Sequence, residues 1–172
     1  TQIAILPEDF TSPRYLSNFN DADVVVLATR WSSPDIKQLK ETIEYIYNKG
    51  KQVVVVLNKP QFNYKIQTNS HTIIDRFVID SEINSSIWSS NDVDLQVKFG
   101  QIFYKSITRA AEIFNQRILN ITADYSYVTV LDPFDYSCSH KLRSCDVVTN
   151  KGEKIYYDYA HYTLAGSRFF GK

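Results

Sequence analysis

Asp158 and His161 are the residues whose types and spacing best suit catalysis. They lie three positions apart in the segment YYDYAHYTLAG, after a short apolar stretch and just before a predicted terminal helix. On a tight turn, this spacing lets the carboxylate accept a hydrogen bond from one imidazole nitrogen, and the other nitrogen then faces outward as a base. The pair is two-thirds of a hydrolase triad. The alternative interpretation is a His that caps a helix beside an ordinary surface Asp.

Cys138 and Cys145 are the only cysteines, and they lie in one polar loop, CSHKLRSC. A local disulfide is favoured over two unrelated reduced thiols, because loop cysteines at this separation can meet the geometry of the bond. A disulfide implies a location outside the cytosol, whereas two reduced thiols would fit a cytosolic protein. A zinc site would need two more ligands, and only His140 lies nearby. We therefore predict no metal.

The segment GSRFFGK at residues 166–172 has the spacing of a phosphate-binding loop. No predicted strand precedes it, no Ser or Thr follows its Lys, and two Phe occupy positions that must approach phosphate closely. We interpret the match as accidental and predict no cofactor.

Two short apolar segments predict buried parallel strands at residues 22–28 (ADVVVLA) and 52–57 (QVVVVL). A helix is predicted between them, with Ser32 or Ser33 as its cap, Pro34 in its first turn and Gly50 as its stop. A strand, a helix and a strand joined by short loops form a right-handed βαβ unit. The fold class is therefore α/β.

The rest of the chain is patterned less evenly. Residues 59–100 are polar and predict a long excursion in which only residues 73–79 form a firm apolar piece. A long helix is predicted over residues 99–122, and a third strand over 127–131. A short strand at residues 154–157 and a terminal helix at 163–170 complete the prediction.

Length and charge exclude several classes of protein. The chain has 172 residues, 44% of them hydrophobic, which predicts a single globular domain over residues 1–172. Its 19 basic residues balance 19 acidic ones without a basic cluster, so no nucleic acid is expected as a partner. The apolar runs are far too short to span a bilayer. Because the sequence contains no Met and begins with no signal segment, we expect a piece of a longer chain.

Several motifs, taken together and in this order, resemble the SGNH hydrolase/acyltransferase superfamily. They are VVVLATRW at residues 24–31, the Cys138/Cys145 loop, YYD at 156–158 and HYTLAG at 161–166. They are most similar to the SGNH domains that follow membrane acyltransferase type 3 domains in bacterial envelope O-acyltransferases. The resemblance covers about residues 21–171, apart from residues 59–100.

The resemblance implies a flavodoxin-like three-layer α/β/α sandwich with a parallel sheet. It also implies acyl transfer, most simply of an acetyl group, to or from hydroxyls of an envelope glycan. Asp158 and His161 would be catalytic, and a membrane acyltransferase domain would lie in the same parent chain. The expected partners are a glycan acceptor and an acyl donor, and the expected location is extracytoplasmic. Arg30, Trp31 and Tyr162 are candidates for the substrate cleft, because sites on open parallel sheets lie beyond the carboxyl ends of the strands.

The sequence departs from the family in two respects. The Gly-Asp-Ser element that carries the family nucleophile does not occur in these residues, and the oxyanion-hole Asn has no clear counterpart. We therefore expect the first strand and the Ser upstream of Thr1, and an inert chain in their absence. Arg30 and Trp31 could equally form a salt-bridge and packing pair.

Two other functions stay open at this point. The first is a non-catalytic envelope module that binds a glycan or a partner, with Trp31, Trp88, Tyr159 and Tyr162 as stacking platforms. The second is a plain regulatory flavodoxin-like domain, which is weaker because no acidic phosphoacceptor pocket is evident.

Overall fold

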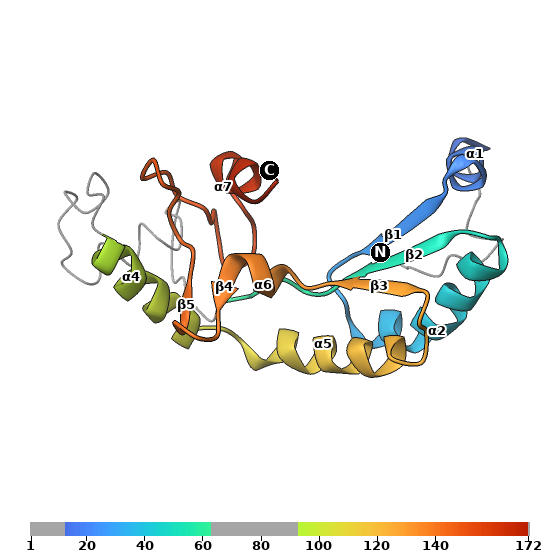
Figure 1. Cartoon of the computed structure of the whole chain (residues 1–172), viewed down its shortest axis with the longest axis horizontal. Helices are drawn as coiled ribbons and strands as arrows, with labels where there is room; N and C mark the ends of the chain where they lie inside the picture. The colour runs from blue at the N-terminus through green and yellow to red at the C-terminus, as the bar shows by residue number, and fades with distance from the viewer. Residues whose placement is uncertain (1–12, 63–92, 172) are drawn as a thin grey trace. The chain divides into compact units, whose positions relative to one another are not determined.

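The computed structural model describes residues 13–62 and 93–171, and the chain divides into two compact units (Figure 1). Unit 1 comprises residues 1–58 and 109–133. Unit 2 comprises residues 59–108 and 134–172. Each unit has its own core and is described by itself.

Unit 1 holds a parallel sheet of three strands in the order β1-β2-β3. The strands are β1 (Val24–Ala28), β2 (Gln52–Val56) and β3 (Val128–Leu131). In register, Val25 lies beside Val53, and Val53 beside Val128. The parallel sheet confirms the α/β prediction, and the strands predicted at residues 22–28, 52–57 and 127–131 are present within two residues of their expected ends.

Helices α2 (Ser33–Asn48) and α5 (Arg109–Thr122) are the crossovers that join these strands, and they lie on the same side of the sheet (Figure 1). This follows from topology, because successive right-handed crossovers that step in one direction place their helices on one face. The core between helices and sheet is aliphatic; its buried residues include Leu27, Leu39, Ile43, Ile46, Val53, Val55 and Ile118.

Local sequence signals set the ends of α2. Ser32 is its N-cap, and the Ser32 N–H donates a hydrogen bond of 2.9 Å to Oδ2 of Asp35 in the first turn. Gly50 ends the helix region with a φ of 75°, a left-handed conformation that glycine adopts without strain. Both signals were predicted from the sequence.

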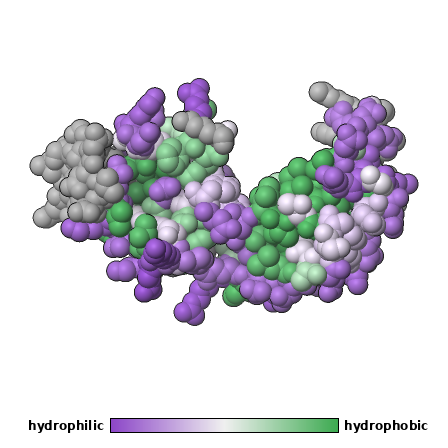
Figure 2. Space-filling model, in the orientation of Figure 1, coloured by the Kyte–Doolittle hydropathy of each residue, from purple (hydrophilic) through white to green (hydrophobic). Residues whose placement is uncertain are grey.

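The opposite face of the sheet is also apolar. Val24, Val26 and Leu131 alternate with the buried positions and are exposed by 42%, 56% and 49%. Figure 2 shows hydrophobic residues gathered over the strands of unit 1 in this view. This accounts for the continuous apolar pattern of the strands, which is typical of sheets with two apolar faces.

Unit 2 contains α4 (Val93–Lys105), the two-residue strands β4 (Cys138–Ser139) and β5 (Ser144–Cys145), and α7 (Leu164–Phe170). Most of the short helix α6 (Pro133–Ser137) also belongs to it. Its core is largely aromatic and includes Phe62, Phe99, Phe103, Ile155 and Tyr156. Aromatic rings dominate because they bury a large area in a segment with little regular structure.

The predicted helix over residues 99–122 is wrong in one respect, because it is two helices, α4 and α5. The chain leaves the helical path at residues 106–108, where the Thr108 N–H donates to the Gln61 carbonyl oxygen over 2.7 Å. Ile107 pairs there with Phe62 as an isolated antiparallel bridge. This pairing with a distant segment ends the ladder of i to i−4 hydrogen bonds. The break cannot be predicted from the apolar stripe, because the stripe continues through residues 106–108.

The predicted strand at residues 154–157 is also wrong, since this segment forms only isolated bridges, Val148 with Lys154 and Tyr156 with Tyr162. Helices α1 (Pro13–Asp21) and α6 were not predicted. The apolar piece at residues 73–79 lies outside the described residues. Over the part of the chain that is described, no helix is long and apolar enough to cross a membrane.

Candidate active site

The chain reverses tightly just before α7. Tyr156 and Tyr162 pair as an antiparallel bridge, and the Tyr157 N–H donates to the His161 carbonyl oxygen over 2.7 Å. Asp158 and His161 therefore belong to the turn that closes the reversal. Backbone hydrogen bonding between residues 157 and 161 closes this turn.

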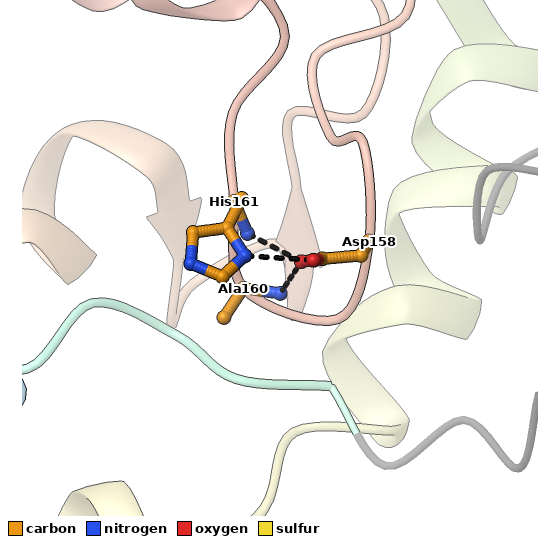
Figure 3. Close-up of polar contacts among 3 residues, drawn as sticks. All are labelled: Asp158, Ala160 and His161. Atoms are coloured by element: carbon orange, nitrogen blue, oxygen red, sulfur yellow. Dashed lines mark hydrogen bonds and ion pairs between the residues drawn. The ribbon is translucent and has the colours of Figure 1, made fainter.

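The two side chains are bonded to each other across the turn (Figure 3). Asp158 Oδ2 lies 2.7 Å from His161 Nδ1. Asp158 Oδ1 accepts the backbone N–H groups of Ala160 and His161 over 2.8 and 2.7 Å, so both carboxylate oxygens are engaged. The hydrogen bond predicted from the spacing is present. It arises because an Asp side chain readily bonds the backbone two or three residues on in a turn.

These bonds determine the charge of Asp158. Partial burial would raise its pKa, but the bonds from the Ala160 N–H, the His161 imidazole and the His161 N–H outweigh burial and hold the pKa below its usual value. The carboxylate is therefore ionised at neutral pH and can only accept hydrogen bonds. It follows that Nδ1 of His161 carries the proton and that Nε2 of the neutral ring has a free lone pair.

His161 presents that lone pair to its surroundings. Its side chain is 66% exposed, whereas that of Asp158 is 28% exposed. Nε2 points away from the carboxylate (Figure 3). The pair can therefore accept a proton from an incoming hydroxyl at Nε2, and Asp158 would stabilise the imidazolium that forms. That Nε2 opens onto a cleft at the carboxyl ends of the strands stays a prediction.

Helix α7 anchors the turn from its C-terminal side. Thr163 is the N-cap, and its hydroxyl accepts the Gly166 N–H over 3.0 Å. The Thr163 N–H donates to the Ile155 carbonyl oxygen over 2.8 Å. A Cβ at Gly166 would lie only 2.2 Å from that oxygen, so only glycine permits this approach.

Buried aromatic rings support the turn from its N-terminal side. Tyr156 is fully buried, and its ring packs edge-to-face on Phe62 with 4.9 Å between centroids. Phe62 packs in the same manner on Phe103 at 5.1 Å. The Phe62 N–H also donates to the Tyr159 carbonyl oxygen over 2.9 Å, which ties the chain after β2 to the turn.

Trp31 and Arg30, the two candidates for the substrate cleft that follow β1, differ in their exposure. Trp31 is only 2% exposed, and its indole Nε1 donates to the Val56 carbonyl oxygen over 2.7 Å. Asn58 accepts the Trp31 N–H and is bonded in turn to Asn115, an anchor that the sequence analysis missed. These contacts favour the packing interpretation of Trp31. Arg30 is exposed after the carboxyl end of β1, and its role in a cleft stays a prediction.

The other aromatic candidates differ in their surroundings. Tyr162 is half-buried between Tyr156 and Phe170, with ring centroids 5.3 and 5.1 Å away, and burial raises the pKa of its hydroxyl. Tyr159 is half-buried beside His161. Trp88 lies outside the described residues. Tyr157 is 64% exposed next to the Asp158–His161 pair, and it is the aromatic residue there that the sequence analysis did not single out.

The cysteine loop forms a disulfide, as predicted. Cys138 and Cys145 face each other across the β4–β5 pair, with an S–S distance of 2.07 Å. His140 of this loop lies 2.9 Å from the Tyr104 hydroxyl and stacks on Phe134. Within residues 13–62 and 93–171, no group of three or more His, Cys, Asp or Glu side chains could hold a metal.

A family model described as "SGNH domain (fused to AT3 domains)" matches residues 13–172. The chain belongs to this family. The match spans both compact units and confirms the resemblance drawn from the motifs. No curated protein and no solved structure matches the chain.

Membership of the SGNH family supports an acyltransferase-type or hydrolase-type function. Asp158 and His161, bonded over 2.7 Å, have a geometry suited to proton transfer, and their catalytic role stays a prediction.

Proposed function

We propose that this SGNH domain takes part in acyl transfer, most simply of an acetyl group, to or from carbohydrate hydroxyls of an envelope glycan. The observation that carries the proposal is the 2.7 Å bond between Asp158 and His161, with the imidazole exposed on its other side. This arrangement is the acid and base half of a Ser-His-Asp site. Family membership supplies the class of chemistry.

The nucleophile in this scheme is a Ser supplied from outside these 172 residues. Its oxygen attacks the acyl carbon of the donor while His161 Nε2 takes its proton and then gives that proton to the departing donor oxygen. In the second half, a sugar hydroxyl attacks the acyl-Ser, and its proton passes through Nε2 to the Ser oxygen. Asp158 balances the charge of the imidazolium in both halves.

The location of the domain and the composition of its parent chain are part of the same proposal. The Cys138–Cys145 disulfide and the fusion of the family to AT3 domains support an extracytoplasmic location and a membrane acyltransferase domain in the parent chain. The alternative of a purely glycan-binding module is less well supported, because Trp31 is buried and one face of the Tyr162 ring is covered by Lys59.

The test is to follow the acyl group in a chain extended upstream through the expected Gly-Asp-Ser element. Incubation with 4-nitrophenyl acetate and a methyl glycoside should give an acetylated Ser by peptide mass spectrometry, and then an acetylated sugar. A His161→Ala variant of the same length should give neither product. An acetylated sugar that forms without any acyl-Ser, or at an unchanged rate in the variant, would contradict the proposal.

A further inference from the structure

Lys59 is a cationic residue of unit 2 whose charge interacts with that of Asp158. It lies three residues after the end of β2, its side chain is half-buried, and its Nζ lies 4.4 Å from the centroid of the Tyr162 ring. Tyr162 is the residue next to His161. An ammonium over a tyrosine ring at this distance is held by a cation–π interaction.

The backbone that carries Lys59 is fixed against the catalytic turn. The next residue, Pro60, is buried, and Phe62 donates its N–H to Tyr159 within the turn. Phe62 itself is packed into the aromatic core of unit 2. Lys59 is therefore placed beside the Asp158–His161 pair by a rigid segment rather than by a loose loop.

The positive charge of Lys59 is not neutralised within the described residues. Asp158 attracts it, but both oxygens of that carboxylate are occupied by the turn and by His161. In the described part of the chain, Lys59 forms neither an ion pair nor a hydrogen bond. Burial lowers the pKa of Lys59, opposed by the attraction of Asp158, so the ammonium has lost hydration without gaining an ion pair among the residues that the structure describes.

We infer that Lys59 is a binding residue for an anionic sugar, one that bears a carboxylate or a phosphate beside the hydroxyl that exchanges the acyl group. A carboxylate or phosphate oxygen would replace the lost water around the ammonium and form a charge-assisted hydrogen bond. Tyr162 would keep the ammonium in place. This inference rests on the proposed function, since it names the substrate class of the same site.

The test compares acetyl acceptors in the parent-length protein, with 4-nitrophenyl acetate as the donor. Methyl glucuronoside and methyl glucoside 6-phosphate are the anionic acceptors, and methyl glucoside is the neutral one. We expect at least one anionic acceptor to exceed the neutral one about tenfold or more in kcat/KM, the usual size of one charge-assisted hydrogen bond. Comparison of the two anionic acceptors distinguishes a carboxylate from a phosphate.

Variants assign that preference to Lys59. Lys59→Gln should remove the preference by raising KM for the anionic acceptor, and Lys59→Arg should retain part of it. The matched control is Lys105→Gln, an exposed lysine at the end of α4, which should keep the preference. Equal use of all three acceptors by the unmodified protein would overturn the inference. So would an equal fall in kcat for all three in Lys59→Gln, because Lys59 would then act on the acyl transition state.

A binding measurement separates this inference from the proposed function. Calorimetric titration of the parent-length His161→Ala variant should show binding of the preferred anionic acceptor, and the added Lys59→Gln change should weaken it about tenfold. Binding that depends on Lys59, together with a failure of the unmodified parent-length protein to transfer an acyl group, would overturn only the proposed function. Binding that does not depend on Lys59 would overturn the inference, whatever the activity.

Discussion

Among single residues, Asp158 determines how the stability of the turn at residues 157–161 depends on pH. Its pKa is held below the usual value of about 3.9 by hydrogen bonds that exist only in the folded chain. The unfolded chain therefore binds the proton more readily. The stabilisation is fully present above about pH 5 and is lost as the pH falls through the pKa of the folded state.

Replacement of Asp158 tests this dependence on pH. Asp158→Asn should lower the free energy of unfolding at pH 7, because the amide cannot accept the same charge-assisted bonds. The difference from the unmodified chain should shrink at pH 3, because the carboxyl group of the unfolded chain, with its ordinary pKa, is then largely protonated. Urea unfolding measures the difference in unfolding free energy between the variant and the unmodified chain at each pH. Equal differences at pH 7 and pH 3 would show that the Asp158 carboxylate does not cause the pH dependence.

At the scale of the element, α7 can lie against Ile155 only because residue 166 is glycine. Gly166→Ala would place a methyl group 2.2 Å from the Ile155 backbone oxygen, which cannot rotate away, so either α7 or the segment around Ile155 must shift. We expect a loss of about 1 to 3 kcal/mol in unfolding free energy by urea titration. Ser167→Ala is the matched control, since it lies exposed in the same helix and should change stability by less than about 0.5 kcal/mol. Equal effects of the two substitutions would refute this role of Gly166.

The β4–β5 pair also carries a prediction at this scale. Its disulfide closes a short loop, for which chain entropy predicts a stabilisation of about 2 to 3 kcal/mol. A Cys138→Ser/Cys145→Ser double variant should unfold at correspondingly lower urea concentration. Thiol titration of the denatured, unreduced chain should find no free thiol, and two titratable thiols would refute the bond.

At the scale of the whole molecule, elements with a strong local signal could be predicted and those that depend on distant pairing could not. The strands of unit 1 are continuous apolar runs, and α2 carries both a cap and a stop, so each was predictable. The break between α4 and α5 depends on residues 61–62. Helices α1 and α6 have only 9 and 5 residues, too few to give a sustained periodic signal.

The same distinction applies to the site. The bond between Asp158 and His161 is local, so a spacing of three residues was enough to predict it. Lys59 lies about a hundred positions away from Tyr162, and only the tertiary structure brings them together. For Trp31 the local signal was misleading. Its position after a strand suggested a place in a cleft, whereas the side chain is buried and the residue is bonded to Asn58 and Val56.

We propose that His161 is the base of an acyl-transfer site, and the rate of 4-nitrophenyl acetate hydrolysis measures this role. The 172-residue chain should be inert, and the chain extended through Gly-Asp-Ser should be active. His161→Ala should reduce kcat/KM of the extended chain by a factor on the order of 10³ or more. The control is His140→Ala, because His140 is bonded to Tyr104 and lies outside the turn. This substitution should leave most of the kcat/KM of the extended chain. An extended chain that hydrolyses the ester equally well without His161, or a short chain whose hydrolysis depends on His161, would contradict the account.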